Sequence, residues 1–218
     1  MAFHLIRRGV LALAAAVAGF GQAPAEVRNP GLQYAVILVV RHAEQDPGSL
    51  QAAPSGTSRA RAVLSHDLAP EGSARAQAYL DYFRTFPMDG QPMRPDCLIA
   101  AGDARDNRCP RLTLEPLARA WGLAIDGRFK AREVTDLVRE LRSRPHGRVI
   151  LIAWQSGEIP GLLRALGVDP ARVLPGGTWP EAVCNWVLQL NCDAQGRVAE
   201  AMAFNENLLP QDSAHPAG

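Results

Sequence analysis

The stretch from Tyr34 to Glu44 reads YAVILVVRHAE, and the rest of the chain is organised around it. Its six consecutive apolar residues, 35–40, include four β-branched ones, which is typical of a short strand buried on both faces. In an open parallel sheet, ligands bind beyond the carboxyl ends of the strands. Arg41 and His42 follow the run at that end, so a cation and a candidate nucleophile stand where a binding site is expected.

The remaining pattern alternates between strands and helices. Apolar runs that predict buried strands lie at 95–101 and 148–154. Helical patterns lie at 70–86, 109–121, 131–142 and 159–166, and a hairpin of two strands is expected at 182–190 and 197–205. This alternation predicts an α/β three-layer sandwich, a mostly parallel sheet with helices on both faces. The segment 44–69 lacks periodicity, and we expect a loop that borders the site.

Composition limits the partners. The 218 residues include 23 basic and 22 acidic ones, a net charge of +1, and 47% are apolar. The near-neutral charge gives no sign of a basic surface that would bind nucleic acid. The length and apolar content are typical of one globular domain with a hydrophobic core. A small ligand is therefore expected rather than a nucleic acid, and the sequence does not determine the oligomeric state.

Residues 1–25 have the layout of a secretory signal peptide. Arg7 and Arg8 precede an apolar run at 9–20, and small residues follow at 23–25. The run is short for a bilayer span, although an uncleaved membrane anchor is the alternative. We expect cleavage, a mature single domain at 26–218 with no membrane contact, and a periplasmic or secreted location.

The four cysteines are an even number, as expected for disulfides in an oxidising compartment. Four cysteines allow three connectivities, and we favour Cys97 with Cys109 and Cys184 with Cys192 because each pair closes a short loop. No pair has metal-ligand spacing and no histidine lies close by. Neither a metal site nor a cofactor is expected.

A buried strand that ends in Arg-His-Ala resembles the opening of the histidine phosphatase superfamily, also called the phosphoglycerate-mutase-like family. Residues 68–72, LAPEG, are similar to the family's Leu-Thr-Pro-x-Gly helix start. The strand, turn and Ile-Pro helix at 148–163 are very similar to its third motif. The resemblance covers roughly residues 34–166 and implies the histidine phosphatase-like form of the α/β sandwich.

The family's second motif has an arginine four residues before a helical threonine. Thr113 looks like that threonine, but Cys109 stands four residues before it. Arg108 is the nearest arginine, and Arg105 is the second choice. The resemblance therefore assigns a phosphate-binding role to Arg108 or Arg105.

The resemblance also implies covalent catalysis, in which His42 attacks phosphorus and a phosphohistidine forms. Arg41, together with the arginine of the second motif, would hold the phosphoryl oxygens, where transition-state charge collects. Glu44 and Glu158 lie near the expected site and are both candidates for the general acid.

The family has a second histidine after the third strand, and this chain has none there. Counting back four residues from Ile159 gives Gln155, whereas the alignment that Trp154 and Pro160 favour gives Ser156. Both residues can donate a hydrogen bond but carry no charge. Losing one oxyanion donor typically costs about 10²–10³ in rate. His66, in the long loop, is a candidate to take its place.

Two functions remain open. The first is a phosphate-monoester hydrolase, slowed by the missing histidine. The alternative is a catalytically inactive relative of the phosphatases that binds a small phosphorylated or anionic ligand.

Overall fold

The computed structural model describes residues 31–46, 67–88, 91–92, 94–104 and 107–212. The expected signal peptide, His66 and Arg105 lie outside the described residues. In the described ranges, no helix has both the length and the apolar character that crossing a membrane requires.

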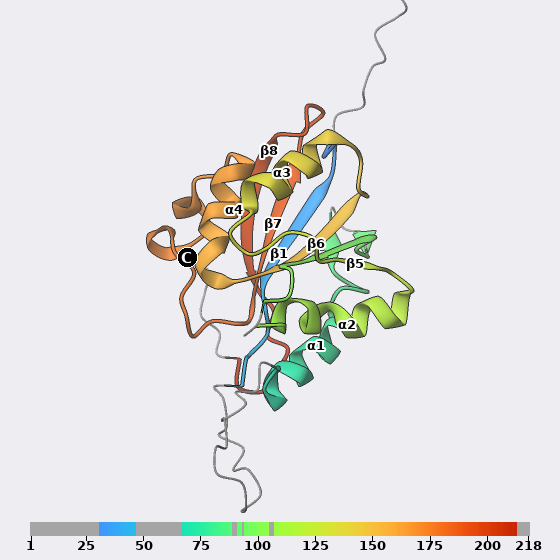
Figure 1. The fold of residues 1–218 in the computed structure, drawn as a ribbon, viewed down its shortest axis with the longest axis vertical. Helices are drawn as coiled ribbons and strands as arrows, with labels where there is room; N and C mark the ends of the chain where they lie inside the picture. Colours follow the sequence, from blue (N-terminus) through green and yellow to red (C-terminus); the bar gives the residue numbers. More distant parts are fainter. Residues whose placement is uncertain (1–30, 47–66, 89–90, 93, 105–106, 213–218) are drawn as a thin grey trace, which may run out of the picture.

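A six-stranded sheet forms the centre of the molecule, in the order β5-β4-β6-β1-β7-β8 (Figure 1). Neighbouring strands are parallel from β5 to β1, whereas β7 and β8 are antiparallel to their neighbours. The mostly parallel sheet is thus confirmed. Its strands are β1 (Val36–Arg41), β4 (Cys97–Ala100), β5 (Ile125–Asp126), β6 (Val149–Trp154), β7 (Trp186–Cys192) and β8 (Val198–Asn205), and a separate short hairpin pairs β2 (Pro87–Met88) with β3 (Gln91–Pro92).

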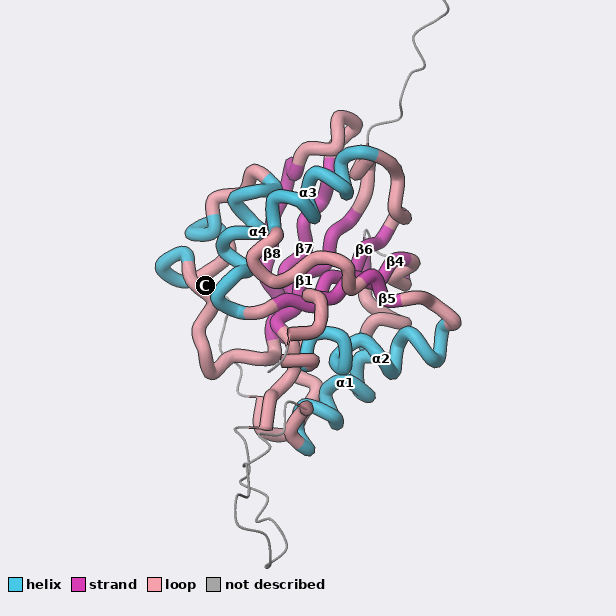
Figure 2. Tube along the Cα trace, viewed as in Figure 1, coloured by secondary structure: helices cyan, strands magenta, loops and turns pink. Residues whose placement is uncertain are grey.

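Two pairs of helices cover the two faces of the sheet, as Figures 1 and 2 show. One face carries α1 (Pro70–Tyr82) and α2 (Cys109–Trp121), and the other carries α3 (Val134–Ser143) and α4 (Ile159–Leu166). The predicted three-layer α/β sandwich is confirmed. Short 3-10 turns lie at η1 (Ser156–Glu158), η2 (Pro170–Arg172) and η3 (Pro175–Gly177).

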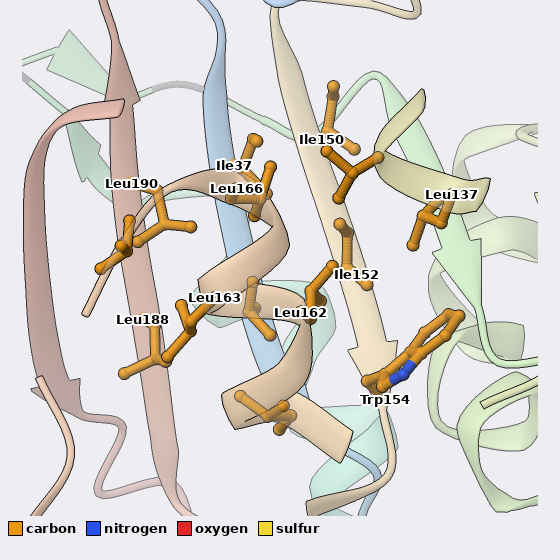
Figure 3. Packing of buried hydrophobic residues seen from close by; sticks show 14 of the residues in the cluster. Ile37, Leu137, Ile150, Ile152, Trp154, Leu162, Leu163, Leu166, Leu188 and Leu190 are labelled. Atoms are coloured by element: carbon orange, nitrogen blue, oxygen red, sulfur yellow. The ribbon is translucent and has the colours of Figure 1, made fainter. Parts of the chain in front are cut away.

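Alternating side chains of the central strands supply both cores. Ile37 and Val39 of β1 pack on the side of α3 and α4, whereas Leu38 and Val40 pack on the side of α1 and α2. Figure 3 shows the leucines of α4 against β1, β6 and β7. Because both faces are covered, the strands read as unbroken apolar runs rather than as an alternating pattern.

The start of α1 lies directly against the segment that follows His42. Pro70 is the first helical residue, as predicted. A Cβ on Gly72 would stand 2.2 Å from the carbonyl oxygen of Glu44, so only glycine allows this approach. The backbone N–H of Ala69 donates to the same carbonyl at 2.9 Å.

The first strand of the predicted hairpin starts later than expected, at Trp186 instead of 182. Residues 181–183 turn toward Arg41, whose guanidinium donates to the carbonyl groups of Glu181 and Val183. These carbonyls therefore have a partner outside the sheet.

The predicted disulfides are absent, because none of the four cysteines is bonded to another. Cys184 precedes β7 and Cys192 ends it, so about 20 Å of extended strand separates them. Cys97 begins β4, whereas Cys109 begins α2, beyond the opposite end of that strand. A disulfide requires Cα atoms within about 7 Å, so the favoured pairing was wrong.

Candidate functional site

The candidate site lies at the carboxyl end of β1, where pairing with β6 continues one residue past the strand. The register pairs Arg41 with Trp154, and the His42 N–H donates to the Trp154 carbonyl at 2.9 Å. Gln155 follows the last residue of β6, and its backbone is still extended. Register and alternation therefore bring His42 and Gln155 together on the side of α1 and α2. Arg41 and Trp154 belong to the opposite side, where Figure 3 shows the Trp154 ring.

The surroundings of His42 favour its neutral ring, and Nδ1 is the ring nitrogen with a hydrogen-bond partner among the described residues. Its side chain is buried, and Nδ1 lies 2.8 Å from the Ala43 carbonyl oxygen. A carbonyl can only accept, so Nδ1 carries the proton and Nε2 keeps its lone pair. Burial lowers the pKa of His42 and Arg41 acts in the same direction, whereas the hydrogen bond to Ala43 and the charge of Glu44 oppose them. The ring is thus suited to nucleophilic attack near neutral pH.

Thr113 fixes the residue that follows the nucleophile. Its fully buried hydroxyl accepts the N–H of Ala43 at 2.9 Å and donates to the carbonyl of Cys109 at 2.7 Å. The first turn of α2 is thereby joined to the end of β1. The threonine picked out by sequence resemblance is thus in direct contact with the His42 segment.

Arg41 is half-buried, and one of its donors is both buried and unpaired among the described residues. Its Nη1 donates to the carbonyl groups of Glu181 and Val183. Its Nε is buried and has no hydrogen-bond partner among the described residues. Buried N–H groups are rarely left unpaired, so this donor is suited to an incoming anion.

Arg108 is placed beside the site rather than inside it. It precedes α2, and its side chain forms an ion pair with Asp67, both about half exposed to solvent. These two residues line a cavity of about 400 Å³ between α1 and α2. In the described structure, Arg108 makes no hydrogen bond to Arg41 or His42. Exposed ion pairs are weak, typically about 0.2–1 kcal/mol, so an anion could compete for this arginine.

Glu44 is engaged by an arginine that sequence reasoning missed. Arg75 of α1 donates to the Glu44 carboxylate from Nε at 3.1 Å and from Nη2 at 2.6 Å. The other edge of the guanidinium contacts Asp212. The signal was present: Arg75 stands in the buried stripe of α1 beside Ala76 and Tyr79, a position where an arginine needs partners.

The turn after β6 contains Gln155 and Ser156, the two positions that the sequence resemblance aligns with a second histidine. The Gln155 carbonyl accepts the N–H groups of Glu158 and Ile159, which fixes the turn. The side chains of Gln155 and Ser156 are half-buried and make no hydrogen bond within the described part of the chain. Glu158 lies 3.7 Å from Arg132, in an exposed ion pair.

No protein-family model and no curated protein matches the chain. Two similar solved structures are a protein histidine phosphatase, SixA, in complex with tungstate and a mycobacterial glucosyl-3-phosphoglycerate phosphatase. The first has 14% identity and a TM-score of 0.42, covering 77% of this chain and 96% of the other. The second has 15% identity and a TM-score of 0.45, covering 80% of this chain and 99% of the other.

Proposed function

We propose that this chain is a phosphate-monoester hydrolase of the histidine phosphatase type, with His42 as the nucleophile. The observation that supports it is the hydrogen bond from Nδ1 to the Ala43 carbonyl, which leaves the Nε2 lone pair available at the carboxyl end of β1. The Nε2–P bond would form as the P–O bond to the leaving alcohol breaks, and the leaving oxygen would take a proton from a general acid or from water. A water molecule then cleaves the phosphohistidine and releases phosphate.

The phosphoryl oxygens need donors on both sides of His42. Arg41 supplies its Nε–H, which has no partner among the described residues, and Gln155 follows the residue that pairs with Arg41, so it lies beside His42. A neutral amide gives a weaker hydrogen bond than an imidazolium, since charge-assisted bonds are roughly twice as strong. We therefore expect slow hydrolysis of the phosphate ester. Ser156, favoured by the alignment on Trp154, is the other candidate donor.

Arg108 would join the site by changing partner. The phosphate or another acidic group of the substrate would compete with Asp67 for the exposed guanidinium. Arg105, the second choice for this role, lies outside the described residues. Glu44 is held by Arg75, so the general acid remains unassigned between Glu44, Glu158 and water.

A second function, binding without catalysis, is supported by Gln155, because its uncharged side chain would stabilise the transition state less than an imidazolium. The site would then bind a small phosphorylated or anionic ligand without turning it over. The two functions share the anion pocket at Arg41 and His42, and only turnover separates them.

The decisive experiment compares two histidines in an assay with a generic aryl phosphate. His42→Ala should abolish hydrolysis and the acid-labile phosphoryl label on the protein. His146→Ala is the matched control, because His146 precedes β6 at the opposite end and contacts the Glu140 carbonyl. Vanadate that raises the melting temperature without any hydrolysis would select the binding function. A chain that neither binds vanadate nor hydrolyses the ester has neither function.

We also propose export, from the layout of residues 1–25. Expression in a bacterium with an intact secretion system should give a mature N-terminus near residue 26, outside the cytoplasm. After unfolding, all four cysteines should react with an alkylating reagent, because the fold separates the pairs that close short loops. Intact-mass measurement checks both points. An unprocessed Met1 would contradict the export proposal.

A further inference from the structure

Arg75 is a deeply buried charge that the proposed mechanism does not use. It is 1% exposed, and three carboxyl groups surround it. Glu44 accepts at 2.6 and 3.1 Å, Asp212 accepts at 2.6 and 2.9 Å, and Glu206 lies 3.8 Å away. A buried guanidinium requires such partners, because removing one of them leaves an uncompensated charge.

The arginine ties the nucleophile segment to two distant parts of the chain. Arg75 and Glu44 are 31 residues apart, and Arg75 and Asp212 are 137 residues apart. Asp212 also accepts the N–H groups of Leu208 and Leu209 at 2.8 and 2.9 Å, which closes the turn after β8. Glu44 is bonded to α1 through its backbone carbonyl as well, so both its main chain and its side chain are held.

We propose that Arg75 is a positioning residue of the anion site: it holds the Glu44 carboxylate against α1 and cancels its charge two residues from His42. The consequence for turnover rests on the proposed function, but the electrostatic consequence at His42 does not. Without Arg75, a carboxylate would stand beside a site that must bind an anion and keep an imidazole neutral.

The charged groups around His42 and Glu44 determine in which direction the loss of Arg75 would shift the pKa of His42. His42 is influenced by Arg41, which lowers its pKa, and by Glu44, which raises it. Glu44 faces Arg75, and beyond the guanidinium lie Asp212 and Glu206. A nearby negative charge favours the protonated form of a histidine and so raises its pKa. An uncancelled Glu44 would therefore protonate His42 at higher pH and repel phosphate.

The competing explanation is purely structural, in which the cluster only fastens the C-terminal turn to α1. The two explanations differ in what Glu44 contributes. If Arg75 acts through the charge of Glu44, removing that charge should repair the loss of Arg75. If Arg75 only fastens the fold, a second substitution in the cluster repairs nothing.

The test follows the His42 ring by NMR titration of the full chain, with His42→Ala used to assign its signal, and measures vanadate affinity alongside. Arg75→Gln should raise the pKa of His42 and weaken vanadate binding about tenfold. Adding Glu44→Gln should return both values to those of the wild type. Asp212→Asn, the matched control that removes the other ion pair, should not raise the pKa.

Neither readout requires turnover, so an inert wild type refutes hydrolysis and leaves the Arg75 proposal testable. A double variant as impaired as Arg75→Gln, or an Asp212→Asn that behaves identically to it, would overturn the proposal. If Arg75→Gln does not fold, the pKa of His42 in the Glu44→Gln single variant tests the proposal. The pKa of His42 should then fall, because Glu44 no longer opposes the lowering effect of Arg41, and an unchanged pKa overturns the proposal.

Discussion

The two faces of the sheet have different chemistry. On the side of α3 and α4, the packed cluster is apolar and runs from Leu32 to Cys192. On the side of α1 and α2, an apolar cluster is bordered by buried polar groups, among them His42, Thr113 and Arg75. The face with α3 and α4 is thus mainly an apolar core, with Arg41 at its edge, whereas the face with α1 and α2 holds most of the groups that the site uses. Substitutions on the two faces should separate stability from anion binding.

The largest effect is expected on the apolar face. Leu163→Ala removes a fully buried side chain from α4 and should destabilise the fold by about 2–5 kcal/mol. The folded variant should bind vanadate as the wild type does. Denaturant unfolding and vanadate titration measure the two quantities, and Met202→Ala, at an exposed position of β8, should cost less than about 1 kcal/mol. A Leu163→Ala variant that folds but no longer binds vanadate would show that the faces are not separable.

A pH-dependent effect of a few kcal/mol is expected on the polar face. Glu206 is fully buried, 3.8 Å from Arg75 and next to Tyr79, and burial raises its pKa from 4.5 to about 8. Between these two values the folded state holds a proton that the unfolded state has released, so this group makes stability fall as pH rises. One pKa unit corresponds to about 1.4 kcal/mol.

Glu206→Gln should therefore remove a downward slope of stability between about pH 4.5 and pH 8. The measurement is the free energy of unfolding of wild type and variant at several pH values. Glu200→Gln, at an exposed position of β8, is the matched control and should leave the slope intact. Parallel curves for wild type and Glu206→Gln would show that Glu206 is ionised in the folded protein.

The fold was largely predictable because its signals are local. Each apolar run needs only its own residues to indicate a buried strand, and Pro70 marks the start of α1 by its missing N–H. The site was predictable where a motif is contiguous, as at Arg41 and His42. Thr113 was also found, through its spacing in the second motif.

What the sequence did not reveal depends on contacts between distant residues. The cluster at Arg75 joins positions 44, 75 and 212, and no local pattern links them. The disulfide prediction failed for the same reason. A short separation along the chain between Cys184 and Cys192 becomes a long distance when the residues between them are extended.

A moderate effect on both stability and binding is expected where the polar face meets the nucleophile. Thr113→Val keeps the volume but leaves the Ala43 N–H without an acceptor, a loss of about 1–3 kcal/mol. Vanadate affinity should fall with it, because the segment after β1 is no longer held. Thr113→Ser keeps the hydroxyl and should retain most of both. Full vanadate affinity in Thr113→Val would remove this threonine from the site.

The smallest effect is a gain, at the turn that replaces the second histidine. Register and alternation bring Gln155 next to His42, whereas the alignment on Trp154 favours Ser156. An imidazolium at the correct position would add a charge-assisted hydrogen bond to the phosphoryl oxygens, and a gain of about 1.4 kcal/mol at the transition state is tenfold in rate. Gln155→His should raise aryl phosphate turnover about tenfold.

Ser156→His is its matched control, since it adds the same ring one residue further along, where η1 begins. Successive residues of an extended chain point to opposite sides of the sheet. Turnover should therefore rise in only one of the two variants, the one whose imidazole reaches the phosphoryl oxygens. A gain in Ser156→His alone would mean that the backbone turns immediately after Trp154 and that the motif alignment is the better guide. A wild type already as fast as its histidine variants would mean that another group supplies the missing charge. Arg108 is then the first to test, because its exposed ion pair with Asp67 leaves it able to change partner.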